Sequence, residues 1–96
     1  MGAALIGGMD RLHRDYREAA HEAGVRLKTY TGKEHGLGGR IGPSTAFVVL
    51  MTAQISHSAR REVLAAAKAN GIPVYLLRSS GVSTLRECLN AVARPA

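Results

Sequence analysis

The chain has 96 residues, a length that predicts one domain with a single hydrophobic core. Its 13 lysines and arginines against 7 carboxylates give a formal net charge of +6, which favours anionic partners such as phosphorylated metabolites, nucleic acid or an acidic protein surface. The single cysteine, Cys88, excludes an internal disulfide and fits a reducing compartment. No segment approaches the roughly 20 apolar residues of a transmembrane helix, and no basic segment precedes the first apolar run, so a soluble cytoplasmic domain without a secretory signal is expected.

The first third of the chain predicts a strand, a helix and a second strand. An apolar run over residues 3–6 ends in two glycines, and apolar side chains then recur at spacings of three and four until Gly24. That recurrence predicts an amphipathic helix, closed by a glycine that tolerates the left-handed conformation. Residues 25–30 alternate between apolar and polar or charged side chains, which predicts a half-exposed strand at a sheet edge.

Residues 31–45 form a glycine-rich stretch with five glycines and one proline. It has neither a helical nor a strand period, so we expect a long irregular loop. Within it, residues 36–41 lack the sixth-position glycine of the dinucleotide-binding fingerprint and precede a strand instead of opening a helix. Two basic residues, Lys33 and Arg40, suggest an anion-contacting flap as the alternative to a plain connector.

Residues 46–51, with the sequence A-F-V-V-L-M, are the centre of the predicted fold. Six consecutive apolar residues leave no face for water, as in a parallel strand that is covered by helices on both sides. Apolar residues at helical spacing between 59 and 67 predict the helix that follows, and Asn70 and Gly71 end it.

The last quarter of the chain predicts a strand over residues 74–77, a turn over 78–81 and a final amphipathic helix, and residues 94–96 are expected to fray. The count is four strands and three helices in one domain that spans residues 1–96. Because crossovers between parallel strands are right-handed, the simplest strand order is 2-1-3-4. We therefore predict an α/β fold, a small Rossmann-like three-layer domain with a four-stranded parallel sheet.

The predicted topology gathers polar residues at one edge of this sheet. Order 2-1-3-4 has its switch point between the first and third strands, and ligands of such sheets bind outside the carboxyl ends of the strands at that point. The exit turns supply glycines, hydroxyl groups, one imidazole and one guanidinium, and the free amides at helix starts favour an anion. The candidate ligand-binding residues are Gly7, Gly8, Asp10, Thr52, Ser56, His57, Arg78, Ser79 and Ser80.

Three other functions are open on the residues alone. His57 is a candidate metal or haem ligand, with His13, His21 or His35 as further ligands. Only a dimer or a folded-back loop would assemble enough of them, because no two of these histidines have helix-pair spacing. A hydrolase would use Ser56 or Ser79 as nucleophile and His57 as base, and Asp10 is the one carboxylate in the predicted turns that would orient the base. Nucleic-acid binding through basic helices is weakened by the small number of aromatic residues, three tyrosines and one phenylalanine.

Several short motifs resemble those of one bacterial family. They are L-I-G-G at residues 5–8, Y-R-E at 16–18, I-S-H at 55–57, G-I-P at 71–73, R-S-S at 78–80 and V-S-T-L at 82–85. Together they resemble the family known as domain of unknown function 2325 over nearly the whole chain. The resemblance implies a small Rossmann-like domain and no established reaction. Members commonly carry a histidine-rich turn after the second strand and cysteines at the exit of the third. At those places this chain has T-Y-T-G (29–32) and M-T-A (51–53), although His57 occupies the matching Ser-His pair.

The leading prediction is a ligand-binding or regulatory domain. Enzymatic activity is the less favoured alternative, no catalytic residue is identified, and the cofactor is unknown. The expected ligand of the domain is a small anionic molecule bound at the carboxyl ends of the first, third and fourth strands. The half-exposed second strand and the small core predict a homodimer, since self-association would bury further surface.

Overall fold

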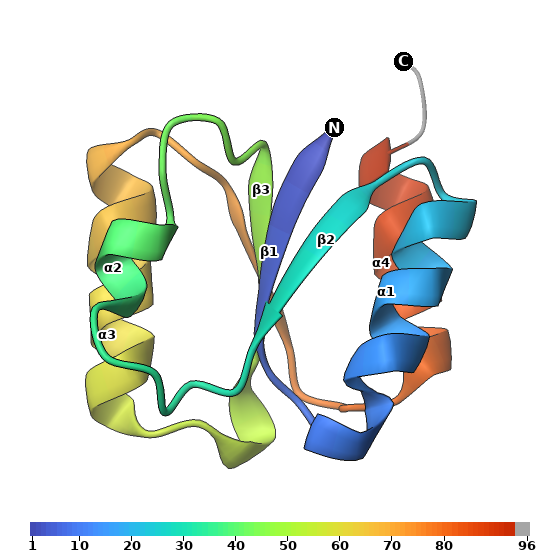
Figure 1. The fold of residues 1–96 in the computed structure, drawn as a ribbon, viewed down its shortest axis with the longest axis horizontal. Coiled ribbons are helices and arrows are strands. Elements are labelled where there is room, and N and C mark those ends of the chain that lie inside the picture. The colour runs from blue at the N-terminus through green and yellow to red at the C-terminus, as the bar shows by residue number, and fades with distance from the viewer. Residues whose placement is uncertain (94–96) are drawn as a thin grey trace.

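The computed structural model describes residues 1–93, and residues 94–96, predicted to fray, lie outside the described part of the chain. Figure 1 shows the arrangement of the elements. In chain order they are β1 (Gly2–Gly7), the 3-10 turn η1 (Asp10–Leu12), α1 (His13–Glu22), β2 (Arg26–Tyr30), α2 (Leu37–Arg40), β3 (Phe47–Met51), the 3-10 turn η2 (Thr52–Gln54), α3 (His57–Ala69), β4 (Val74–Leu77) and α4 (Val82–Ala93).

The four strands form one parallel sheet in the order β2-β1-β3-β4, which confirms the predicted topology. β3 is one of its two central strands. Val48, Val49 and Leu50 have no exposed surface, and Ile6 of β1 lies opposite Leu50. Helices cover both faces of β3, and its apolar run therefore has no polar alternate positions.

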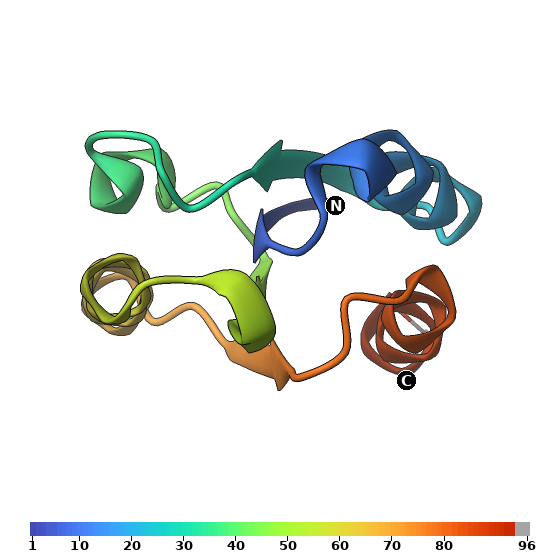
Figure 2. The same cartoon turned by 90° about the horizontal axis from the view of Figure 1, so that it is seen from below.

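Helices cover the two faces of the sheet in pairs. α1 and α4 lie on one face, and α2 and α3 lie on the other (Figure 2). Because side chains alternate along a strand, neighbouring residues of β1 belong to different cores: Leu5 joins the core that contains Tyr16 and Leu89, whereas Ile6 joins the core that contains Val63. This arrangement confirms the three layers of a small Rossmann-like domain. The prediction of a single core is wrong, because the sheet separates two cores, one on each of its faces.

One helix was missed in the predicted count of three, because it lies within residues 31–45, where an irregular loop was predicted. Leu37–Arg40 forms the short helix α2, so four helices surround the sheet in residues 1–93. Leu37 and Ile41 lie one turn apart and are both 1% exposed, packed in the core shared with α3. Two apolar residues among five glycines are too few to show a helical period in the sequence. The helix α2 forms because the side chains of these two residues are buried, although glycine is a poor helix former.

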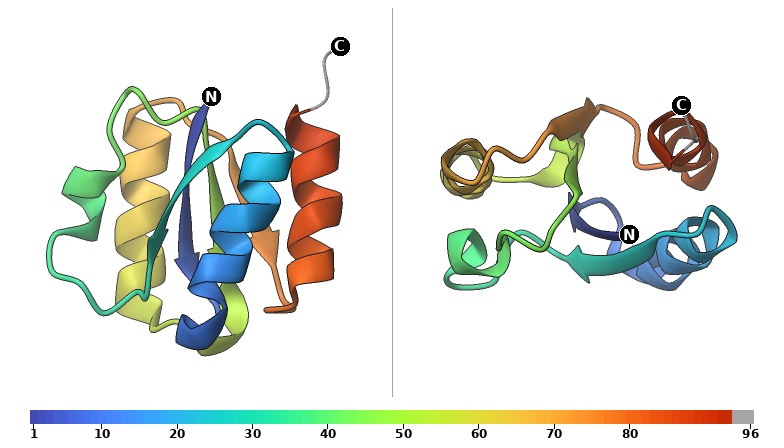
Figure 3. Two further views of the ribbon diagram at one scale, coloured as in Figure 1. Left: turned by 45° about the vertical axis from the view of Figure 1, so that its right-hand side comes forward. Right: turned by 90° about the horizontal axis from the view of Figure 1, so that it is seen from above.

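The carboxyl ends of all four parallel strands share one edge of the sheet, called here the carboxyl edge, and the N-terminus lies at the opposite edge (Figure 3). The carboxyl edge is therefore where the turns after the strands meet. Within the part of the chain that the structure describes, no helix has the length and apolar character needed to cross a membrane.

Candidate functional site

The turns after β1, β3 and β4 lie at the carboxyl edge, as the parallel topology requires, and Figure 2 views that edge directly. Their side chains differ in accessibility. The exposed candidates are Asp10, Ser56, His57, Arg78 and Ser79, the half-buried ones are Thr52 and Ser80, and the buried ones are Gly7 and Gly8. The exposed polar groups thus come mainly from the turns after the neighbouring strands β3 and β4.

The glycine pair after β1 allows a close approach between parts of the protein itself. Gly7 and Gly8 both have positive φ, at 96° and 74°. A Cβ on Gly7 would lie 2.5 Å from the carbonyl oxygen of Met51, and one on Gly8 would lie 2.7 Å from the hydroxyl oxygen of Tyr16. Both positions therefore need glycine for the fold, whatever else they contact.

Sequence reasoning missed Tyr16 as a residue of this edge, and it named His13, which also lies here, only as a further metal or haem ligand. The Tyr16 hydroxyl donates to the carbonyl of Ser80 at 2.6 Å and accepts the N–H of Met9 at 3.1 Å, so it joins the turns after β1 and β4. His13 has Nε2 3.1 Å from the carbonyl oxygen of Gly7. One signal was available for the tyrosine: a Tyr on the buried stripe of a helix needs a partner for its hydroxyl.

The turn after β3 ends in the start of α3. Ser56 is the N-cap residue, and its Oγ accepts the N–H of Ala59 at 3.1 Å. The amides of His57 and Ser58 lie in the first turn, where no intrahelical acceptor exists, and both residues are exposed. This turn therefore offers two backbone donors, a hydroxyl group and an imidazole to solvent.

The turn after β4 offers a positive charge. Arg78 is exposed and forms no ion pair with any other residue of the described range 1–93. The adjacent Ser79 uses its Oγ to accept the N–H of Gly81 at 3.0 Å, which shapes the turn ahead of α4. The Arg78 guanidinium is thus available to a ligand, whereas the Ser79 oxygen already accepts one hydrogen bond.

The turn after β2 differs from the others because a carboxylate of the chain itself occupies its donors. Glu34 accepts the N–H of Thr31 at 2.8 Å, the N–H of Gly32 at 2.9 Å and the hydroxyl of Thr31 at 3.1 Å. Partial burial acts to raise the pKa of Glu34, but these backbone and hydroxyl hydrogen bonds together outweigh it and lower the pKa below its ordinary value. An external anion would therefore have to displace Glu34 from this turn.

The structure brings together neither a metal cluster nor a Ser-His pair among the residues that it describes. No group of three or more His, Cys, Asp or Glu side chains within residues 1–93 could hold a metal ion, so His57 would need ligands from outside this chain. The side-chain hydrogen bonds of Ser56 and Ser79 in this range are those with Ala59 and Gly81 described above, and neither hydroxyl group bonds to His57.

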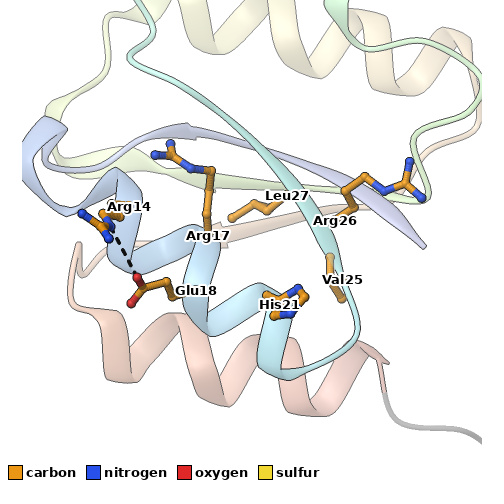
Figure 4. A pocket seen from close by; sticks show the side chains of 7 residues that line it. All are labelled: Arg14, Arg17, Glu18, His21, Val25, Arg26 and Leu27. Atoms are coloured by element: carbon orange, nitrogen blue, oxygen red, sulfur yellow. Dashed lines mark ion pairs between the residues drawn. The ribbon is translucent and has the colours of Figure 1, made fainter.

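Two hollows lie on either side of the edge strand β2, away from the carboxyl edge. The one on the α1 side has a volume of about 470 Å³, and Figure 4 shows its lining, with Arg14 paired to Glu18 at 3.4 Å. The one on the α2 side, called here the basic hollow, has a volume of about 480 Å³. Its charged and aromatic lining residues are Arg26, Lys28, Tyr30 and Arg40.

Comparison with known proteins identifies the fold and the family. No curated protein matches the chain. A de novo designed Rossmann fold protein is similar in structure, with a TM-score of 0.67 at 15% sequence identity, over 99% of this chain and 100% of the designed chain. At this identity the similarity shows the fold alone, and it agrees with the predicted Rossmann-like domain.

The family model described as "Uncharacterized protein conserved in bacteria (DUF2325)" matches residues 3–92. That span contains most of β1, all of β2, β3 and β4, and nearly all of α4. The match agrees with the motifs found in the sequence. The chain therefore belongs to this bacterial family.

Proposed function

We propose that this domain binds a small anionic ligand at the carboxyl edge and acts as a ligand-binding or regulatory domain, not as an enzyme. The observation that carries the proposal is the exposed Arg78, which has no ion-pair partner in residues 1–93, in the turn next to the one that presents the amides of His57 and Ser58. These are a guanidinium fork and the donors of a helix start, the groups that recognise phosphate or carboxylate.

The charges favour the β3 and β4 side of the edge over the β1 side. Asp10 is exposed in the first turn of η1, and its carboxylate would repel an anion that approaches the turn after β1. Glu34 occupies the donors after β2. The anion would therefore lie between the turns after β3 and β4, where Arg78 supplies a fixed charge and a protonated His57 adds to it.

The test is an NMR titration of the ¹⁵N-labelled protein with inorganic phosphate, followed amide by amide. Saturable shifts are expected at His57, Ser58 and Ser79. Arg78→Ala should weaken binding by about 1.5–3 kcal/mol, the scale of a hydrogen bond to a charged group. Arg61→Ala, an exposed arginine elsewhere on α3, is the matched control and should leave binding unchanged.

Two results would contradict the proposal. One is the absence of saturable shifts at this edge. The other is an equal loss of affinity in Arg78→Ala and Arg61→Ala, because equal losses would indicate non-specific attraction to the net positive charge.

We also propose that the domain forms a homodimer through β4. This strand, V-Y-L-L, is an edge strand without a charged residue, and its Leu76 is 48% exposed. The other edge strand, β2, carries Arg26 and Lys28, so two copies paired there would bring like charges together. Pairing of β4 with its copy would satisfy the free backbone groups of both edges.

A reducing cytoplasmic location is inferred from the unpaired Cys88.

A further inference from the structure

The basic hollow exists because α2 is short. A full-length crossover helix would cover the faces of β1 and β2 from end to end, but α2 ends at Arg40, after four residues. The space beside β2 therefore stays open, and it is lined by Arg26 and Lys28 of the strand and by Arg40 of α2. Its volume of about 480 Å³ lies within the usual range of roughly 300–1,000 Å³ for small-molecule sites.

The three cations of the basic hollow have no anionic partner within residues 1–93. The ion pairs of this range are Arg14 with Glu18 and Arg86 with Glu22, and no carboxylate of the range lines the hollow. Arg40 instead lies over the ring of Tyr30, with its guanidinium carbon 5.7 Å from the ring centroid.

The two carboxylates near this crossover are engaged elsewhere. Glu34 binds the turn after β2, and Glu62 of α3 accepts the N–H of Gly38 at 2.9 Å. The fold thus collects three positive charges around one hollow and directs its nearby negative charges away from it. Like charges that line one hollow repel one another, and an anion bound among them would relieve that repulsion.

Two glycines that line the same hollow have no explanation in the fold. Gly39 and Gly42 are not among the glycines with positive φ, and a Cβ at either would meet no atom within 4 Å. Gly39 also lies inside α2, where glycine is less stable than alanine. The neighbouring Gly38 differs, since its Cβ would lie 3.4 Å from the side chain of Glu62. A glycine that neither conformation nor packing requires is typical of a backbone that a ligand approaches closely.

We propose that the basic hollow is a second anion site, which binds a small ligand carrying two or more linked phosphate groups. Three separate cations match more negative charge than one phosphate carries, and the missing side chains at Gly39 and Gly42 let a ligand approach the backbone closely. The N–H of Gly39 already donates to the carbonyl of Gly36 at 3.1 Å, so within the described residues Gly42 supplies the backbone donor. The hydroxyl groups of Ser44 and Thr45, which also line the hollow, supply further donors. This site is separate from the one proposed at the carboxyl edge and does not depend on it.

A small ligand fits the hollow better than a nucleic acid strand. Single-stranded nucleic acid binds along grooves with several aromatic platforms, and here Tyr30 is the one aromatic side chain that lines the basic hollow in the described structure, with a guanidinium already over its ring. A strand that crossed β2 would also have to contact the α1-side hollow, where Glu18 pairs with Arg14 and Arg17 donates to Thr29 at 2.8 Å.

The test is binding of inorganic pyrophosphate, followed by NMR and by calorimetry. Saturable shifts are expected at the amides of Gly39 and Gly42. Lys28→Gln and Arg40→Gln should each weaken pyrophosphate binding about tenfold, the lower range for loss of a hydrogen bond to a charged group. Arg61→Gln, which removes an exposed charge from α3, is the matched control and should bind as the unmodified protein does. Arg78→Ala should also leave pyrophosphate binding in the hollow unchanged, which separates this site from the carboxyl edge.

Gly39→Ala is a second test, in which stability and pyrophosphate binding should change in opposite directions. Alanine favours the helix, so the thermal midpoint should rise, while the added methyl group should weaken pyrophosphate binding by roughly threefold or more through lost close approach. A purely structural role for Gly39 would not produce that opposition.

Four results would overturn the proposal. The first is the absence of saturable pyrophosphate shifts in the basic hollow. The second is a loss of affinity in Arg61→Gln as large as that in Lys28→Gln. The third is a Gly39→Ala variant that binds pyrophosphate as well as the unmodified chain does. The fourth is tighter binding of a ten-nucleotide thymidine oligonucleotide than of pyrophosphate, lost in Arg17→Gln and steeply dependent on salt, which would assign the surface to nucleic acid.

Discussion

The hydroxyl group of Tyr16 donates a hydrogen bond to the carbonyl oxygen of Ser80, across 2.6 Å and 64 positions of sequence. The same hydroxyl accepts the N–H of Met9. One fully buried atom therefore fixes the turn after β1 against the turn after β4, although the two strands do not neighbour one another in the sheet. The position of Arg78, two residues before Ser80, depends on this link.

Tyr16→Phe should lower the free energy of unfolding by about 1–3 kcal/mol, because it leaves the Ser80 carbonyl and the Met9 N–H without their partner while the ring stays packed. Urea denaturation followed by circular dichroism measures this change. Tyr75→Phe is the control, since its ring packs edge-to-face on Phe47 and its hydroxyl makes no hydrogen bond within residues 1–93. Equal stability of Tyr16→Phe and the unmodified protein would contradict the role given to the hydroxyl.

Gly8→Ala should cost roughly 2–5 kcal/mol of unfolding free energy, from two sources. The left-handed backbone is strained for alanine, and the new Cβ would overlap the Tyr16 hydroxyl and the Met51 sulfur, 2.7 and 2.8 Å away. Gly24→Ala separates the two, because Gly24 has φ of 76° but open space around it, so that substitution should cost only about 1–2 kcal/mol. If both variants lose the same stability, packing at Gly8 is not what requires glycine.

The strands and their order followed from the sequence because they depend on local pattern, whereas the division of the interior into two cores did not. The apolar run of residues 46–51 required cover on both faces, and the parallel order then had few alternatives. The edge location of β2 followed from its alternation in the same way. The carboxyl edge could be listed residue by residue for the same reason, since parallel strands fix which turns share an edge.

The features that could not be predicted depend on contacts between distant segments. Gly7 and Gly8 were predicted as ligand-binding residues, but the atoms that they approach, Met51 O and Tyr16 Oη, belong to other elements of the protein. The helix α2 forms where Leu37 and Ile41 are buried, and no sequence period indicates it. Its short length leaves the basic hollow open. The carboxylate of Glu34 turns back onto Thr31 and Gly32 through geometry that spacing alone does not show.

Glu34→Gln should destabilise the protein by about 1–2 kcal/mol at pH 7, because a neutral amide accepts the hydrogen bonds of Thr31 and Gly32 less strongly, and solvent near the partly exposed group limits the loss. Because the pKa of Glu34 is lower in the folded state, its contribution to stability decreases as the pH falls. Its contribution is complete above the unfolded value of about 4.3 and is lost as pH falls through the lower folded value.

The stability difference between the unmodified protein and Glu34→Gln should therefore shrink as urea denaturation is repeated from pH 6 down to about pH 3. Glu87→Gln is the matched control, because this exposed carboxylate on α4 forms no ion pair within residues 1–93. A difference that stays constant over this range, or that grows as the pH falls, would contradict the role given to the Glu34 carboxylate.

Leu76→Lys should convert the proposed β4-paired homodimer into a monomer at micromolar concentration. Two copies related by a two-fold axis would place their β4 strands side by side, so each lysine would add a positive charge close to its copy and remove apolar surface from the contact. Sedimentation velocity measures the change. Ala65→Lys adds the same charge at an exposed position of α3 and should leave the dimer intact. A monomeric unmodified protein under these conditions would exclude the dimer, and a dimer that persists in Leu76→Lys but dissociates in Lys28→Glu would move the contact to β2.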